Sequence, residues 1–117
     1  CYFISTIEDH IAPWKSTYSG ARNFGGNVRF VLGGSGHIAG IVNPPNPKSK
    51  NWTNPVDELP ESPDEWLAGA TMSPTTWWED WATWISARAG KKLAPPPMGG
   101  EQHPPLSDAP GTYVFGK

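Results

Sequence analysis

Cysteine, charge and long apolar runs are all scarce in this chain of 117 residues. The single cysteine excludes an internal disulfide, and no set of Cys and His residues has metal-site spacing. Charged residues make up 17% of the chain, its formal net charge is −2, and Lys91-Lys92 is its only basic pair. This balance gives no reason to expect nucleic-acid or membrane-surface binding. Because no apolar run reaches the roughly 20 residues that span a bilayer, we expect a cytoplasmic chain without a membrane span.

Glycine, proline and tryptophan are abundant instead, with 13 Gly, 14 Pro and 7 Trp. The prolines gather after Asn43, and the chain changes character there. We expect residues 1–43 to carry strands, residues 44–90 to form a proline-rich extended segment and two Trp-rich helices packing on them, and residues 91–117 to form a Pro/Gly-rich tail. The chain opens at Cys1 directly on an apolar strand that needs neighbours on both sides, which predicts a portion of a larger fold.

Residues 1–43 read as a strand, a helix and a second strand. The β-branched and aromatic runs Tyr2 to Thr6 and Val28 to Leu32 are typical of buried strands. Between them Pro13 can open a helix that Gly25-Gly26 ends. Parallel strands need a crossover of about a dozen residues or more, so we predict an α/β fold with two parallel strands and a right-handed crossover helix. The apolar face of that helix is predicted to hold Trp14, Tyr18 and Ala21.

Two helices are predicted after an extended surface segment from Pro44 to Pro60. Ser62-Pro63-Asp64-Glu65 forms a capping box, and Ser73-Pro74 opens a second helix that Gly90 closes. The tail after Lys91 is expected to be irregular and to lie on the surface, with a short closing segment that docks. The apolar stripe of the second helix is predicted to hold Trp77, Trp81, Trp84 and Ile85, and the closing segment is Tyr113-Val114-Phe115.

Two chemically useful side chains follow the two expected strands. Asp9 comes after the first strand, and His37 lies in a glycine-rich turn after the second. In α/β-hydrolase folds the triad order is nucleophile, acid and histidine, each on a loop after a parallel strand. Asp9 and His37 match the last two members, which places the nucleophile before residue 1. An Asp at this position can also be a plain cap for the helix near Pro13, and the residues leave both interpretations open.

The other candidate groups carry weaker signals. His10 is expected to face outward or to order its loop, and His103 to be solvated in the tail. Cys1 would complete a triad within the chain, but we reject it because it leads into a strand rather than into a nucleophile elbow. The tryptophan row could form a stacking platform in a non-catalytic binding module, although such a stripe is more often core packing. Trp78 lies off the stripe and is the tryptophan that we most expect to be exposed.

Several motifs in order resemble the C-terminal part of polyhydroxyalkanoate synthases. The resemblance covers nearly the whole chain, is weakest from Lys91 to Asp108, and is greatest to the class I enzymes, which favour short hydroxyacyl units. The motifs are Asp9-His10-Ile11-Ala12-Pro13-Trp14, Gly34-Ser35-Gly36-His37-Ile38-Ala39-Gly40, Asn43-Pro44-Pro45, Trp52-Thr53-Asn54, Leu59-Pro60-Glu61-Ser62-Pro63, Trp77-Trp78 with Trp81 and Trp84, and Ala109-Pro110-Gly111-Thr112-Tyr113-Val114.

The resemblance implies an α/β-hydrolase-like catalytic domain, with residues 1–43 as its C-terminal strands. Such a domain polymerises (R)-3-hydroxyacyl-CoA into polyester and releases CoA, using a Cys-His-Asp triad and no cofactor beyond its thioester substrate. Asp9 would be the catalytic aspartate and His37 the catalytic histidine. Asp9 would either orient the imidazole of His37 or help to activate the 3-hydroxyl group of the incoming unit, and the sequence leaves both roles open. The family's cysteine lies in a Gly-x-Cys-x-Gly box that this chain lacks, so the chain alone is expected to be inactive.

Two further implications and one alternative complete the sequence-based hypothesis. The family resemblance implies a location at the surface of polyester granules, with a second synthase subunit and granule-associated proteins as partners. Among enzymes, the alternative is another α/β-hydrolase, esterase-like or lipase-like, with a serine nucleophile upstream.

Overall fold

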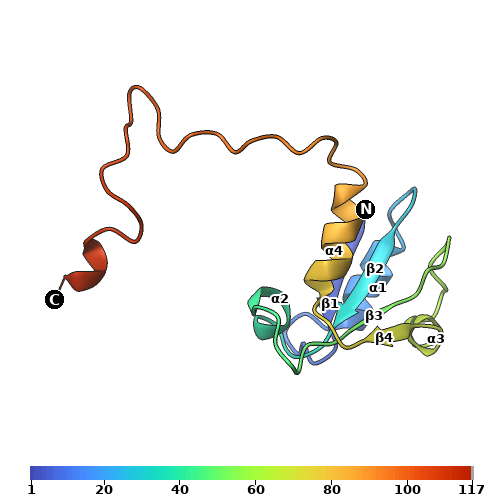
Figure 1. Cartoon of the computed structure of the whole chain (residues 1–117). Coiled ribbons are helices and arrows are strands. Elements are labelled where there is room, and N and C mark those ends of the chain that lie inside the picture. The colour runs from blue at the N-terminus through green and yellow to red at the C-terminus, as the bar shows by residue number, and fades with distance from the viewer. Residues whose placement is uncertain (117) are drawn as a thin grey trace.

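Four short strands form one mixed sheet in the order β1-β2-β3-β4 (Figure 1). The structure is a computed structural model and describes residues 1–116. β1 and β2 are parallel, whereas β3 runs antiparallel to β2 and β4 antiparallel to β3. The strands are β1 (Tyr2–Thr6), β2 (Arg29–Gly33), β3 (Asn51–Thr53) and β4 (Thr71–Ser73), and the α-helices are α1 (Trp14–Ala21), α2 (Ala39–Val42), α3 (Pro63–Ala68) and α4 (Trp77–Ser86).

The parallel pair is built as the sequence predicts. α1 connects β1 to β2, and the register places Tyr2 opposite Arg29 and Thr6 opposite Gly33. Pro13 precedes the helix without a side-chain cap, consistent with a proline at a helix start. The α/β class and the two parallel strands with a crossover helix are therefore confirmed.

Four aromatic rings fill the face of the sheet on which α1 lies. α1 contributes Trp14 and Tyr18, β2 contributes Phe30, and α3 contributes Trp66. Every pair of these rings has its centroids 5.1 to 6.5 Å apart, the range of favourable aromatic contacts. The Tyr18 hydroxyl donates to the Pro60 carbonyl at 2.7 Å, so this buried ring keeps a hydrogen-bond partner. The cluster joins α1 and α3 to the sheet.

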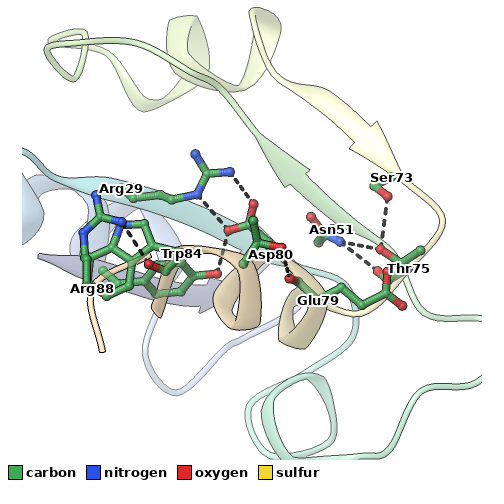
Figure 2. Close-up of polar contacts among 10 residues, drawn as sticks. Arg29, Asn51, Ser73, Thr75, Glu79, Asp80, Trp84 and Arg88 are labelled. Atoms are coloured by element: carbon green, nitrogen blue, oxygen red, sulfur yellow. Dashed lines mark hydrogen bonds and ion pairs between the residues drawn. The ribbon is translucent and has the colours of Figure 1, made fainter. Parts of the chain in front are cut away.

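α4 packs on the opposite face of the sheet. The alternate residues of β1 and β2 that point away from the aromatic cluster lie on this face. Figure 2 shows Asp80 accepting both guanidinium hydrogen bonds of Arg29, and the Tyr2 hydroxyl donates to the same carboxylate at 2.9 Å. The Tyr2 ring also contacts Trp84, with centroids 5.3 Å apart. Burial raises the pKa of the Tyr2 phenol, and the Asp80 charge raises it further. Layers of helix thus cover both faces of the sheet.

Residues 44–90 depart from the predicted pattern. The segment expected to run along the surface contributes β3, in which Asn51 is 2% exposed and pairs with Gly33 of β2. Helix α4 begins at Trp77 rather than at Ser73-Pro74, because residues 71–73 pair with β3 as a strand. It ends at Ser86, short of Gly90. Sequence periodicity identified the helix but could not show which flanking residues the sheet would capture.

The tail also differs from the expectation. Residues beyond α4 run away from the sheet (Figure 1), and nearly all of them are exposed. The closing segment Tyr113–Phe115 forms a short 3-10 helix, η1, but does not dock, since Tyr113 is 96% exposed. Apolar residues in this region therefore find no face to cover among residues 1–116.

Trp66→Ala should lower the free energy of unfolding by about 3–5 kcal/mol, because it empties the centre of the aromatic cluster. Tyr18→Phe should lower it by only about 0.5–1.5 kcal/mol, because the ring stays and only its hydrogen bond to Pro60 is lost. Chemical denaturation followed by circular dichroism measures both. Equal losses in the two variants would contradict the central position of Trp66.

Candidate active site

The loops that follow β1 and β2 lie side by side because the parallel ladder continues beyond both strands. The Ile7 amide donates to the Gly33 carbonyl at 2.9 Å, and the Glu8 amide donates to the Ser35 carbonyl at 3.1 Å. These two bonds carry the register of the sheet into the loops. The carboxyl ends of parallel strands meet at one edge, so Asp9 and the His37 turn reach the same place.

Asp9 and His37 form a direct side-chain pair. The Nδ1 atom of His37 lies 2.8 Å from Oδ2 of Asp9, although 28 positions separate the residues in sequence. The other carboxylate oxygen, Oδ1, accepts hydrogen bonds from the amides of Ile11 at 2.9 Å and Ala12 at 2.8 Å. The Ala12 amide above all, together with His37 and Ile11, holds the pKa of the Asp9 carboxyl below its ordinary value. Asp9 is thus both a loop cap and the partner of the imidazole.

The pair leaves one imidazole nitrogen available for chemistry. An ionised carboxylate only accepts hydrogen bonds, so Nδ1 of His37 carries the proton that it donates to Asp9. In the neutral ring this tautomer leaves a lone pair on Nε2. The His37 side chain is 42% exposed, whereas that of Asp9 is 8% exposed. A carboxylate with little exposed surface that orients a more exposed histidine is an arrangement suited to general acid–base catalysis.

Ser35 and Gly40 set the shape of the loop around His37. Ser35 has a φ of 70°, a left-handed conformation that places a sharp turn before His37. Gly40 packs so closely against β1 that a Cβ atom there would lie 2.4 Å from Cγ2 of Thr6 and 2.5 Å from the Gly34 carbonyl oxygen. Only glycine lets α2 approach the sheet this closely.

The remaining sequence candidates take no part in this pair. Cys1 precedes β1, and a five-residue strand rises about 17 Å, so its thiol stands at the opposite end of the sheet from Asp9. Its amino group donates to the Asn27 carbonyl at 2.6 Å, which fixes it there. His10 is exposed beside the site and His103 is exposed in the tail. The structure therefore agrees with the rejection of Cys1 as a nucleophile.

The tryptophans of α4 divide into two kinds of contact. Trp77 and Trp84 pack against the ring of Tyr2. Trp78 is 37% exposed, as expected, but Trp81, which the sequence places in the apolar stripe, is also exposed, at 42%. Both Trp77 and Trp78 direct their indole N–H groups to the carbonyl oxygen of Ile41 in α2. Sequence analysis missed this contact, although Gly40 inside a short helix is a signal of close packing there.

Three further features complete the description of residues 1–116. A hollow of about 190 Å³ lies between α2, the residues that precede β3 and the start of α4, and Lys48 and Lys50 are among its lining residues. Residues 1–116 contain no group of three His, Cys, Asp or Glu side chains that could hold a metal ion. Within the same residues, no helix has the length and apolarity to cross a membrane.

Several known proteins that are similar to this chain are named as poly(3-hydroxyalkanoate) polymerases. The poly(3-hydroxyalkanoate) polymerase subunit PhaC of Cupriavidus necator is 46% identical over 118 residues, which cover 99% of this chain. The subunit of the same name from Rhizobium etli and the poly(3-hydroxyalkanoate) polymerase 2 of Ectopseudomonas oleovorans are each 45% identical over 97% of the chain. Over these residues the chain belongs with the poly(3-hydroxyalkanoate) polymerases. No family model matches it.

The match is long in this chain but short in the polymerases. The chain spans about a fifth of the length of these curated relatives, at 18–20% of each. Within that fifth it contains the Asp9–His37 pair. The predicted relationship to this family of polymerases is therefore confirmed.

Gly40→Ala should lower the free energy of unfolding by about 1–3 kcal/mol, because the added methyl group has no room beside Thr6 and the Gly34 carbonyl. Gly36→Ala is the matched control in the same loop, since its Cβ would only meet the Glu8 carbonyl oxygen at 3.8 Å. Thermal or chemical unfolding compares the two variants. A Gly36 variant as unstable as the Gly40 variant would contradict the close approach of α2.

Asp9→Asn should lower stability at neutral pH, and the difference from the wild type should shrink on acidification. The folded pKa of Asp9 is lowered, so its stabilisation is present above the unfolded pKa of about 3.9 and is lost as the pH falls through the folded pKa. Urea denaturation of both proteins between pH 7 and pH 3 measures this difference. A difference that grows toward low pH would argue against the hydrogen bonds assigned to the carboxylate.

Proposed function

We propose that this chain supplies the acid and the base of a catalytic domain with an α/β-hydrolase-like fold, which polymerises 3-hydroxyacyl units from CoA thioesters. The observation that carries the proposal is the 2.8 Å contact between Asp9 and His37 at the carboxyl edge of two parallel strands. The relationship to poly(3-hydroxyalkanoate) polymerases supports the substrate class. The carboxyl ends of parallel strands, in a sheet with helices on both faces, are the place where such a site is expected.

The nucleophile in this proposal is a cysteine thiol outside residues 1–117. Nε2 of His37 removes the thiol proton, and the thiolate attacks the acyl carbonyl of the substrate. The carbon–sulfur bond to CoA breaks, and the imidazolium returns the proton to the departing CoA thiolate. Exchange of one thioester for another is close to neutral in free energy, so the barrier depends on positioning and proton transfer.

Chain growth uses the same base a second time. Nε2 of His37 accepts the proton of a 3-hydroxyl group as its oxygen attacks the enzyme thioester. An ester bond forms, the bond to the cysteine sulfur breaks, and the proton passes to that sulfur to regenerate the thiol. General acid–base catalysis of this kind typically contributes about 10²–10⁴-fold to a rate.

Asp9 acts in this proposal by orienting His37. Both of its oxygens are already occupied, one by His37 and the other by the Ile11 and Ala12 amides, and its side chain is 8% exposed. A carboxylate held in this way stabilises the imidazolium that forms during each proton transfer. Its limited exposure argues against a direct role in activating a substrate hydroxyl group.

The proposal extends to the setting of the whole polymerase. Its substrate is (R)-3-hydroxyacyl-CoA, its product is a growing polyester, and the surface of a cytoplasmic polyester granule is the place where the two meet. A second polymerase subunit and granule-associated proteins are the partners implied by the family resemblance.

In the complete polymerase, His37→Ala should abolish release of CoA from 3-hydroxybutyryl-CoA, because the only general base in the proposed mechanism is removed. Release of CoA is measured with a thiol reagent. His103→Ala is the matched control, since His103 is exposed in the tail, and it should retain wild-type turnover. Near-normal turnover in the His37 variant would overturn the proposed function.

A further inference from the structure

We propose that Trp77 and Trp78 are positioning residues that hold the His37 loop through the backbone carbonyl of Ile41. The inference rests on the proposed function of His37 and adds two residues that act through its loop. The Nε1 atom of Trp78 lies 2.9 Å from the Ile41 oxygen, and that of Trp77 lies 3.3 Å from it. A carbonyl oxygen has two lone pairs, so it can accept both bonds at once.

Ile41 is joined to His37 by a short run of backbone hydrogen bonds. The Gly40 amide donates to the Gly36 carbonyl at 3.0 Å, and the Ile41 amide donates to the Ile38 carbonyl at 3.0 Å. These bonds enclose His37 within the same turn that leads into α2. A displacement of the Ile41 carbonyl therefore moves the backbone that carries the imidazole.

α2 has few other contacts that could fix its position. It has only four residues, none of them buried, and the hollow of about 190 Å³ lies along part of its length. Its close contact with the sheet is at Gly40, beside Thr6. A helix of this length has little stability of its own, so it depends on tertiary contacts. The two indole hydrogen bonds hold α2 at Ile41, the residue that follows the sheet contact at Gly40.

α4 is firmly anchored and so can serve as a fixed support. Its Asp80 carboxylate binds Arg29 in β2 and Tyr2 in β1, as Figure 2 shows for Arg29. Just before the helix, the Thr75 carbonyl accepts a hydrogen bond from the Asn51 side chain of β3 at 2.8 Å. Three strands of the sheet thus determine where Trp77 and the rest of α4 stand.

The position of Trp78 is explained better by its hydrogen bond than by burial of its ring. Its side chain is 37% exposed, so burial of its ring explains only part of its position. Its N–H is directed to the same oxygen that Trp77 reaches from the adjacent position. Two neighbouring tryptophans therefore share one acceptor on the helix that follows His37.

The test replaces each indole by a phenyl ring in the complete polymerase, which removes the N–H and keeps an aromatic side chain. Trp77→Phe and Trp78→Phe should each lower kcat about two- to fivefold. The double variant should lower it about thirtyfold to a hundredfold, more than the product of the single effects, because either indole alone still holds the carbonyl. A shift of about 1 Å at a catalytic group is enough for losses of this size. KM for 3-hydroxybutyryl-CoA should change less than twofold.

Trp81→Phe is the matched control, because Trp81 lies on the same helix, is 42% exposed, and has no hydrogen bond to Ile41. It should retain wild-type kcat. A double variant with kcat within twofold of this control would overturn the positioning role, as would a rise in KM that accounts for the whole loss. If the double variant unfolds at a lower temperature than the control, Trp78→Phe alone decides, since its ring is the more exposed of the pair.

His37→Ala, measured beside these variants, separates the two proposals. An inactive His37 variant with a fully active double Trp variant overturns only the positioning role. An active His37 variant overturns the proposed function itself.

Discussion

The parallel pairing of β1 with β2 is the constraint on which the site depends. Its register runs from Tyr2 opposite Arg29 to Thr6 opposite Gly33, and the Ile7 and Glu8 amides continue it into the loops. Without that continuation Asp9 and His37 would be carried by two independent turns, each with its own freedom. With it, the separation of the two side chains is determined by the backbone of the sheet rather than by the loops.

The helices on the two faces of the sheet have different tasks. On one face, α1 and α3 pack on β2 mainly through the aromatic cluster around Trp66, and an exposed ion pair between Lys15 and Asp64 also joins the two helices. On the other face, α4 is held by the ion pair of Arg29 with Asp80 and extends toward α2. The apolar face therefore provides stability, and the mixed face transmits position to the histidine loop.

Local sequence signals predicted those features that local chemistry controls. The β-branched and aromatic run of β1, the Ser62 cap of α3 and the Asp9 and His37 turns all have short-range signatures, and the structure places them as predicted. The capture of Asn51 by the sheet could not be predicted, because a three-residue strand forms only when a neighbouring edge accepts it. The Ile41 contact was missed for the same reason, since a backbone carbonyl has no sequence signature.

Asp9 uses its two oxygens for different purposes, one for the Ile11 and Ala12 amides and one for His37. Local folding of the loop and the electrostatic environment of the imidazole are consequently coupled through a single carboxylate. A substitution that removes the side-chain oxygens, such as Asp9→Ala, changes both at once. Kinetic effects of Asp9 variants therefore measure a sum of loop rearrangement and lost charge, and the purely electrostatic part has to be found from residues that touch His37 without capping the loop.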